Sequence, residues 1–262
     1  MIAERRKYTA TVNGYELSIQ RAGSGAPVLV LPNEDGFETW LPVMDRLAAG
    51  FDVIVPEHPG FRDSDRPSWL DNIHDLAYFY LELLAAENLR NVNLVGFSLG
   101  GWVAAEIAVR NTSRLASLAL VASAGLHVGG VKQIDTYLST DEERIRGLYC
   151  DQTLADQALA ATLEPGAEDI MLKNGMMAAL LSWQPRNYDP HLYKWLHLID
   201  VPTIVLWGDS DRLFPREYAY EFQRLIPKSE VVVFSNCGHM PQIEKAEDFG
   251  AALKRFLIEK GA

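Results

Sequence analysis

The sequence predicts an α/β protein in which a mostly parallel central sheet carries helices on both faces and a helical segment is inserted between two strands. Two observations predict this fold. Short, continuous apolar runs alternate along the chain with helical patterns, which is the order of elements that builds a parallel sheet covered by helices. Roughly 70 residues in the second half contain helix-like pieces and no convincing strand, which is too long for a plain connecting loop.

An antiparallel hairpin is expected at the start of the chain, because Asn13-Gly14 separates two alternating runs at 8–12 and 15–19. The apolar runs that follow are continuous, as in strands buried on both faces. They lie at 28–31, 52–55, 92–95, 115–121, 203–207 and 231–234. Helices are expected between them at 41–48, 72–86, 101–109, 219–225 and 248–258.

The same pattern predicts the domain organisation. Residues 1–125 and 199–262 form one α/β core, and residues 126–198, rich in Leu, Ala, Met and Trp, form a helical lid inserted into it. The alternative for the inserted part is an extra helical layer with no role at the site.

Composition excludes several classes of protein. The 262 residues carry a formal net charge of −11, which argues against nucleic-acid binding, and 48% apolar residues exclude disorder. The two cysteines have no metal-ligand spacing, and neither a metal nor another cofactor is expected. The charged N-terminus at 1–7 and the lack of a long apolar stretch predict a cytoplasmic protein that avoids the membrane and acts on a small molecule. The oligomeric state stays open.

A nucleophile motif directly follows a predicted strand. Residues 96–101 read GFSLGG and match G-x-S-x-G, with the apolar run 92–95 before them and a small-residue helix after them. This strand–turn–helix context is what a nucleophile elbow requires, and it predicts Ser98 as the nucleophile in a strained conformation. The Leu99 N–H would then lie at a helix start, where it favours a developing oxyanion. A glycine-rich packing turn without chemistry is the competing interpretation.

The base and its carboxylate are expected on two later loops. His239 follows the last predicted strand, whereas the other histidines fit surface or packing positions better: His58, His74, His127, His191 and His197. Asp211 lies beyond the strand 203–207 and is the preferred acid, with Asp209 as the second candidate. The order Ser98…Asp211…His239 is the one typical of α/β-hydrolase elbows and differs from that of trypsin-like and subtilisin-like proteases.

These motifs make the chain resemble the α/β-hydrolase superfamily over nearly its whole length. The resemblance rests on GFSLGG, on PEHPGF at 56–61 followed by SDRP at 64–67, on GDSD at 208–211, and on CGHMPQIE at 237–244. It is closest to the lid-bearing branch that holds carboxylesterases and hydrolases of meta-cleavage products. The resemblance implies Ser98 as nucleophile, His239 as general base and acid, Asp211 as the orienting acid and the Leu99 N–H as one oxyanion donor.

The second oxyanion donor is where the chain departs from the family. Members usually read His-Gly-x after the first parallel strand, and this chain reads Pro32-Asn33-Glu34, followed by Asp35. The Glu34 N–H is the expected donor, but a carboxylate here opposes charge on the oxyanion unless it points away. The sequence therefore predicts slow turnover of ordinary esters or a different way of polarising the substrate. Arg62, where the family often has Gly, is a second departure.

Other positions narrow the reaction. Ser98 argues against haloalkane dehalogenases and epoxide hydrolases, which use Asp as the nucleophile. Meta-cleavage hydrolases tend to carry Trp after the catalytic His and Asn before the nucleophile, where this chain has Met240 and Phe97. Cofactor-independent dioxygenases of this fold rank third, because they keep their acid after an earlier strand, and residues 122–124 here read Ala-Ser-Ala.

The expected substrate is a small-to-medium, mainly apolar ester, cleaved through an acyl-enzyme. Phe97, Met177, Trp183 and Met240 are the expected pocket walls, and the lid offers further apolar candidates: Met171, Met176, Tyr188 and Trp195. Arg186 either meets a substrate carboxylate or, more in keeping with its position, is an exposed lid arginine. The alternatives are a C–C bond hydrolase of meta-cleavage-type diketones and a weakened, ligand-binding member of the fold.

Overall fold

The protein is built on one eight-stranded sheet, in which the strands lie in the order β1-β2-β4-β3-β5-β6-β7-β8. The computed structural model describes residues 4–36 and 40–261, so Met1–Ala3 of the charged N-terminus and Ala262 lie outside it. The strands are β1 Arg5–Val12, β2 Tyr15–Gly23, β3 Ala26–Leu31, β4 Phe51–Pro56, β5 Val92–Phe97, β6 Leu115–Val121, β7 Thr203–Gly208 and β8 Ser229–Phe234.

The strand directions confirm the predicted sheet. β1 and β2 form the antiparallel hairpin, and its turn residues Asn13 and Gly14 both have positive φ, at 51° and 84°. β2 also runs antiparallel to β4, whereas every pair from β4 to β8 is parallel. Parallel strands need crossover connections, and the helices predicted between the apolar runs supply them.

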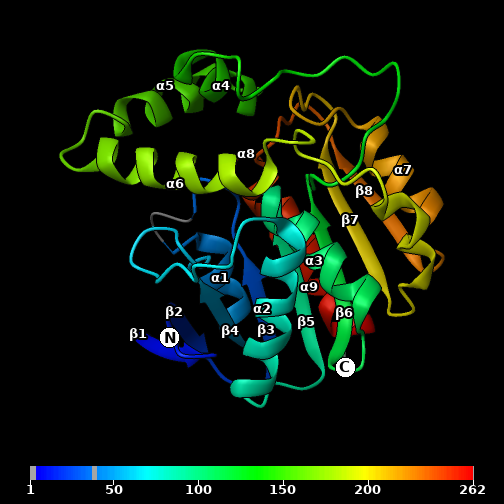
Figure 1. The fold of residues 1–262 in the computed structure, drawn as a ribbon. Coiled ribbons are helices and arrows are strands. Elements are labelled where there is room, and N and C mark those ends of the chain that lie inside the picture. Colours follow the sequence, from blue (N-terminus) through cyan, green and yellow to red (C-terminus); the bar gives the residue numbers. More distant parts are fainter. Residues whose placement is uncertain (1–3, 37–39, 262) are drawn as a thin grey trace.

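Two hydrophobic cores lie on the two faces of the sheet. Leu29 and Leu31 of β3 point into one core, and Val28 and Val30 point into the other. The first core is closed by α2 (Ile73–Ala86), α3 (Leu99–Arg110) and α7 (Glu217–Leu225), and the second by α1 (Pro42–Ala48) and α9 (Ala246–Lys260). Figure 1 shows α2 and α3 on one side of the sheet and α9 on the other. Burial on both faces explains why the strand sequences are continuously apolar.

Between β6 and β7 the chain forms helices and no strand among the described residues. These are α4 (Asp141–Leu148), α5 (Gln152–Ala161), α6 (Ala167–Ser182) and the short 3₁₀ helices η1 (Leu192–Lys194) and η2 (Leu196–Leu198). We call residues 126–198 the helical segment. Figure 1 shows α4, α5 and α6 together beyond one end of the sheet. None of the helices in the described part of the chain is long and apolar enough to span a membrane.

The parallel strands bring their carboxyl ends to one edge of the sheet. The loops that follow β3, β5, β6, β7 and β8 therefore converge there, although they are far apart in sequence. Two glycines show how tightly these loops pack: a Cβ at Gly100 would overlap the Pro32 carbonyl, and a Cβ at Gly208 would overlap the Gly238 carbonyl. Ligand sites of open α/β sheets lie at this edge, and Ser98, Asp211 and His239 all fall on these loops.

Candidate active site

Ser98 lies on a sharp turn between β5 and α3. Its backbone angles are φ 48° and ψ −113°, a conformation that costs free energy for any residue with a Cβ. The surrounding structure enforces it, because the Ser98 N–H donates to Val121 and its carbonyl accepts from Gly101, Trp102 and Ala124. Leu99 is the first residue of α3, where a helix has no internal acceptor for the N–H.

His239 is held by Asp211, and Asp209 plays no part in this contact. His239 Nδ1 lies 2.8 Å from Asp211 Oδ2, and both side chains are buried. The other Asp211 oxygen accepts from the N–H groups of Leu213 and Phe214, at 2.9 and 3.0 Å. Asp209 instead accepts from Ser210 Oγ and the Cys237 N–H. Of the two candidate acids, only Asp211 has the geometry to orient the histidine.

This contact fixes which ring nitrogen of His239 is available. A carboxylate can only accept, so Nδ1 carries the proton that is donated to Asp211, and Nε2 of the neutral ring is left as a base. Nε2 is buried and has no hydrogen-bond partner among the described residues, Ser98 Oγ included. Phe214 packs beside the imidazole, with ring centroids 5.5 Å apart.

Three carboxylates act on the charge of His239. Burial is the largest single influence and lowers the pKa of the imidazole, but the charge and hydrogen bond of Asp211 together with the charges of Glu34 and Asp35 outweigh it. The net result is a pKa above the ordinary value of 6.5. The site thus favours the imidazolium, which is the form that His239 takes after accepting a proton.

A cavity of about 790 Å³ opens beside Ser98. Ser98, Leu99, Ala124, Leu213 and Phe214 line it from the core, and Glu34 and Asp35 line it from the loop after β3. The rest of its described wall comes from the helical segment: Thr136, Tyr137, Asp141, Arg144, Thr162, Leu163, Glu168, Met171, Leu172, Gly175, Met176, Ala178, Ala179, Ser182 and Asn187. This size suits a small-to-medium organic molecule.

The four residues predicted as pocket walls lie elsewhere among the described residues. Phe97 is the last residue of β5 and packs in the core against Phe249. Met177 packs against Gly60 so closely that a Cβ at position 60 would overlap the methionine side chain. Trp183 stacks under the Arg186 guanidinium, and Met240 is buried in the first core. For Phe97 the cause is simple: it precedes Ser98 at the end of β5, and successive side chains of a strand point to opposite faces of the sheet.

Arg186 and the other proposed apolar residues also have clear positions. Arg186 pairs with Asp135 in addition to stacking on Trp183, and it is absent from the described cavity wall. Met171 and Met176 do line the cavity, and Tyr188 and Trp195 do not.

The charged side chains of the cavity wall are mostly acidic. Glu34, Asp35, Asp141 and Glu168 face a single cation among the described lining residues, Arg144. Its Nη1 lies 3.1 and 3.2 Å from the two Asp35 oxygens, and its Nη2 lies 3.8 Å from Asp141. Glu34 has one buried oxygen, Oε2, without a hydrogen-bond partner among the described residues. An anionic ligand would therefore meet uncompensated negative charge here.

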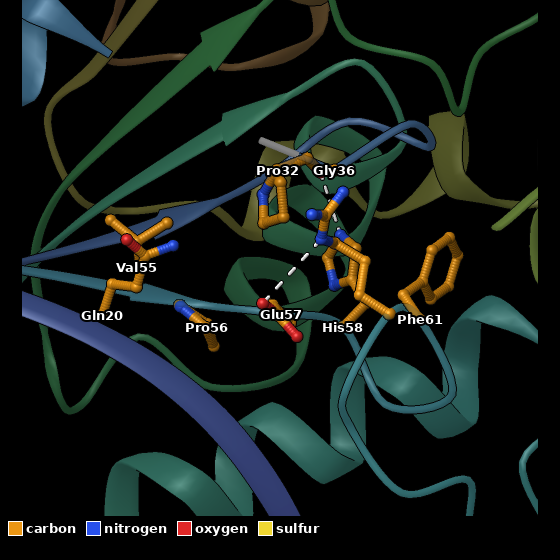
Figure 2. Close-up of a pocket in the computed structure, with 9 residues that line it drawn as sticks. Gln20, Pro32, Gly36, Val55, Pro56, Glu57, His58 and Phe61 are labelled. Atoms are coloured by element: carbon orange, nitrogen blue, oxygen red, sulfur yellow. Dashed lines mark hydrogen bonds and ion pairs between the residues drawn. The ribbon is translucent and has the colours of Figure 1, made fainter. Parts of the chain in front are cut away.

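The loop after β3 is anchored from below by His58. His58 is fully buried; its Nε2 lies 2.9 Å from the Pro32 carbonyl and its Nδ1 lies 2.6 Å from Tyr80 Oη. Because a carbonyl only accepts, Nε2 carries the proton and the neutral ring accepts at Nδ1 from the tyrosine. Burial lowers the pKa of His58 to about 4, although the Pro32 hydrogen bond opposes the shift. Figure 2 shows His58 beneath Pro32 with this contact dashed.

The two departures from the family pattern meet at this loop. Asn33 does not adopt a positive φ, whereas Gly36 does, at 74°. Arg62, in the position where the family often has Gly, also has a positive φ of 43°. Its Nε lies 4.0 Å from Glu57 Oε1.

Away from the cavity, one group of side chains in the described part of the chain has the types that could bind a metal ion. Atoms of His74, Glu106 and Asp189 lie within reach of one another. Arg110 already pairs with Glu106 there, and its guanidinium contacts His74 Nδ1 at 2.6 Å. An arginine thus supplies the positive charge that a metal ion would bring, and we assign no metal to this group.

Comparison with known proteins decides the family. Residues 28–252 match the model of the alpha/beta hydrolase family. The chain belongs to the alpha/beta hydrolase family. A relative named 2-hydroxymuconate semialdehyde hydrolase, from Pseudomonas sp. (strain CF600), is 25% identical, with 95% of this chain and 93% of the relative aligned.

Solved structures of this hydrolase fold agree with it. The chain is similar to a meta-cleavage product hydrolase with a TM-score of 0.77 and 20% identity, covering 96% of this chain and 98% of the other. It is similar to a thermophilic esterase with a TM-score of 0.76 and 21% identity, covering 98% and 99%. At these identities the two likenesses support the fold.

Sequence reasoning missed several residues that shape the site of this hydrolase. Arg144 and Asn174 lie in the helical segment, where no motif marks them, and they contact the loop after β3 from above. His58 was expected at a surface or packing position, and the sequence around it, Pro59 included, does not indicate its hydrogen bond to the Pro32 carbonyl. These roles depend on contacts across more than 20 residues, so a local pattern carries no signal for them.

The low pKa of His58 predicts a loss of stability in acid. Below about pH 6.5 the unfolded chain binds a proton at this histidine, whereas the folded chain does so only near pH 4, so the stabilisation is complete above pH 6.5 and is lost as the pH falls toward 4. From pH 7.5 to 4, wild type should lose up to about 3 kcal/mol more unfolding free energy than His58→Gln. Urea unfolding measures both; equal losses would contradict the assignment.

The contact between Asp211 and His239 predicts a pKa change. Asp211→Asn should lower the pKa of His239 below that of wild type, because burial is then opposed by fewer charges. NMR titration of the His239 ring measures it. Asp209→Asn is the matched control and should leave the value unchanged. A shift in the Asp209 variant with none in the Asp211 variant would reverse the assignment of the acid.

Proposed function

We propose that this alpha/beta hydrolase is a serine hydrolase that cleaves an uncharged, mainly apolar carboxylic ester with Ser98, His239 and Asp211. One observation carries the proposal. Ser98 lies at a strained turn on the wall of a cavity, on the same sheet edge as the buried His239. The Nε2 of this histidine has no partner among the described residues, and its Nδ1 is held by a carboxylate. This is the constellation of nucleophilic acyl transfer.

The proposed reaction has two steps. Ser98 Oγ attacks the ester carbonyl while its proton passes to His239 Nε2, and the tetrahedral intermediate collapses to an acyl-enzyme as the alcohol leaves with that proton. Water then attacks the acyl group with His239 again as base, and the acid and free Ser98 are released. Asp211 keeps the proton of Nδ1 in place and stabilises the imidazolium in both steps.

Backbone donors stabilise the oxyanion in this proposal. The Leu99 N–H at the start of α3 is one of them, and the Glu34 N–H is proposed as the second. The Glu34 carboxylate has two opposing effects: it stabilises the His239 imidazolium and destabilises a nearby oxyanion. A modest turnover number is the expected consequence.

We assign residues 126–198 to a lid over this site. The proposal rests on the cavity wall, most of which comes from that segment, with Met171, Leu172 and Met176 among its apolar members. These flexible side chains suit acyl groups of different lengths. Exclusion of water by such a cover strengthens the electrostatic effects inside the site.

The charges of the wall favour a neutral ester over an acid. Arg144 is the one cation among the described lining residues, and Asp35 and Asp141 already compensate it. A substrate carboxylate would lie against Glu34 and Asp35 without a free partner among these residues. Repulsion between the substrate carboxylate and these two like charges would reduce binding strongly.

C–C bond hydrolysis is the second candidate, and the names of relatives favour it. The relative from Pseudomonas is named a semialdehyde hydrolase and one similar structure is a meta-cleavage product hydrolase. The same nucleophile and base can serve a diketone, whose carbon leaving group must then be protonated. The acidic wall argues against it where the diketone carries a carboxylate.

A substrate panel separates the two candidates. Neutral p-nitrophenyl esters of increasing acyl length, p-nitrophenyl hydrogen glutarate and a vinylogous 1,5-diketone are compared by kcat/KM. We expect the pentanoate ester to exceed the equally long, anionic glutarate by about 10-fold or more, which corresponds to ~1.4 kcal/mol, and the diketone to react more slowly. Ser98→Ala should abolish all turnover. Faster cleavage of the diketone than of every ester would instead support the C–C hydrolase.

A further inference from the structure

The loop that is proposed to supply the second oxyanion donor is held from above by helix α6. Asn174, on the inward side of α6, is 2% exposed although its side chain is polar. Its Nδ2 lies 2.8 Å from the Asp35 carbonyl, and its Oδ1 lies 3.2 Å from the Arg62 N–H. A single amide of the helical segment therefore bridges the main chains of two loops of the core.

The orientation of this amide is fixed by its partners. A carbonyl only accepts and a backbone N–H only donates, so Nδ2 must face Asp35 and Oδ1 must face Arg62. Both partners are backbone groups, and both atoms of the amide are used. Aspartate at this position would keep the acceptor for Arg62 but would place a second acceptor against the Asp35 carbonyl.

Nearby contacts show that the bridge acts on a short, constrained piece of chain. The Gly36 N–H donates to the Asn33 carbonyl at 3.0 Å, which closes a turn around Glu34 and Asp35. His58 holds the other end of the loop at the Pro32 carbonyl. Helix α6 holds the Asp35 carbonyl, which lies in the same peptide group as the Gly36 N–H and one residue beyond Glu34.

We propose that Asn174 is a positioning residue that keeps the loop 32–36 in the conformation in which the Glu34 N–H can serve the oxyanion. This inference rests on the proposed function. Asn174 is absent from the described cavity wall, so it acts through the loop and has no contact with substrate. The consequence is that α6 covers the site and also completes it, because displacement of α6 removes the donor to Asp35.

The test compares Asn174→Asp with wild type on the best neutral p-nitrophenyl ester of the panel. Loss of loop position should lower kcat by about 10- to 100-fold, since a small misplacement of a catalytic group has effects of that size. KM should change by less than about 3-fold, because ground-state contacts in the cavity are kept. Asp169→Asn, an exposed change on the same helix away from the cavity wall, is the matched control and should match wild type.

Hydrogen exchange supplies a readout that needs no activity. Backbone amides of residues 33–36 should exchange faster in Asn174→Asp than in wild type, and those of β5 should not. If Asn174→Asp does not fold, Asn174→Ser, which is too short to keep the contact with Asp35, takes its place in both measurements. Unchanged kcat or unchanged exchange at the loop in a folded variant would overturn the proposal. Lack of ester turnover by wild type would overturn the proposed function alone, and the exchange comparison would still test the bridge.

Discussion

The close approach of two backbones is the constraint on which the site depends. Gly100, in the first turn of α3, packs directly against the carbonyls of Leu31 and Pro32, where no Cβ would fit. This contact fixes the loop after β3 beside the nucleophile turn and leaves the loop little freedom to adjust. The strained backbone angles of Ser98 are tolerated because the strand before it and the helix after it are buried, and because backbone hydrogen bonds hold the turn itself. Contacts from His58 below and Asn174 above then act on a loop that is already confined.

Electrostatics at the site favour proton uptake over anion stabilisation. Asp211 is in contact with His239, and Glu34 and Asp35 add the effect of their charges. The arrangement supports a histidine that must hold a proton while an alcohol or a carbon leaving group departs. In the proposed reaction it would destabilise the oxyanion, so accurate placement of the proposed backbone donors would be more important here than in a site with a neutral loop. The buried polar contacts of His58 and Asn174 therefore act on the loop after β3, whose position is the most important for the proposed donors.

The fold could be predicted from the sequence, because the hydrophobic periodicity of each helix and strand shows which of its faces are buried. Continuous apolar strands, the Asn13-Gly14 turn and the helix 72–86 needed no long-range information. Ser98, His239 and Asp211 could be proposed because motifs end at strand termini, and parallel strands end at one edge. The cavity wall could not be predicted: Phe97 and Met240 adjoin site residues in sequence yet point into the cores, and Asn174 and Arg144 act through contacts made only after folding.

Covalent labelling tests most directly whether Ser98 is a nucleophile activated by the fold. Wild type and Ser98→Ala are incubated with a serine-directed fluorophosphonate, and their intact masses are measured. We expect wild type to gain the mass of one phosphonyl group, with the label on Ser98 after proteolysis, and Ser98→Ala to gain none. An unlabelled wild type, or equal labelling of both proteins, would contradict this role of Ser98 and would leave the cavity as the binding site of a member of the fold that performs no serine chemistry.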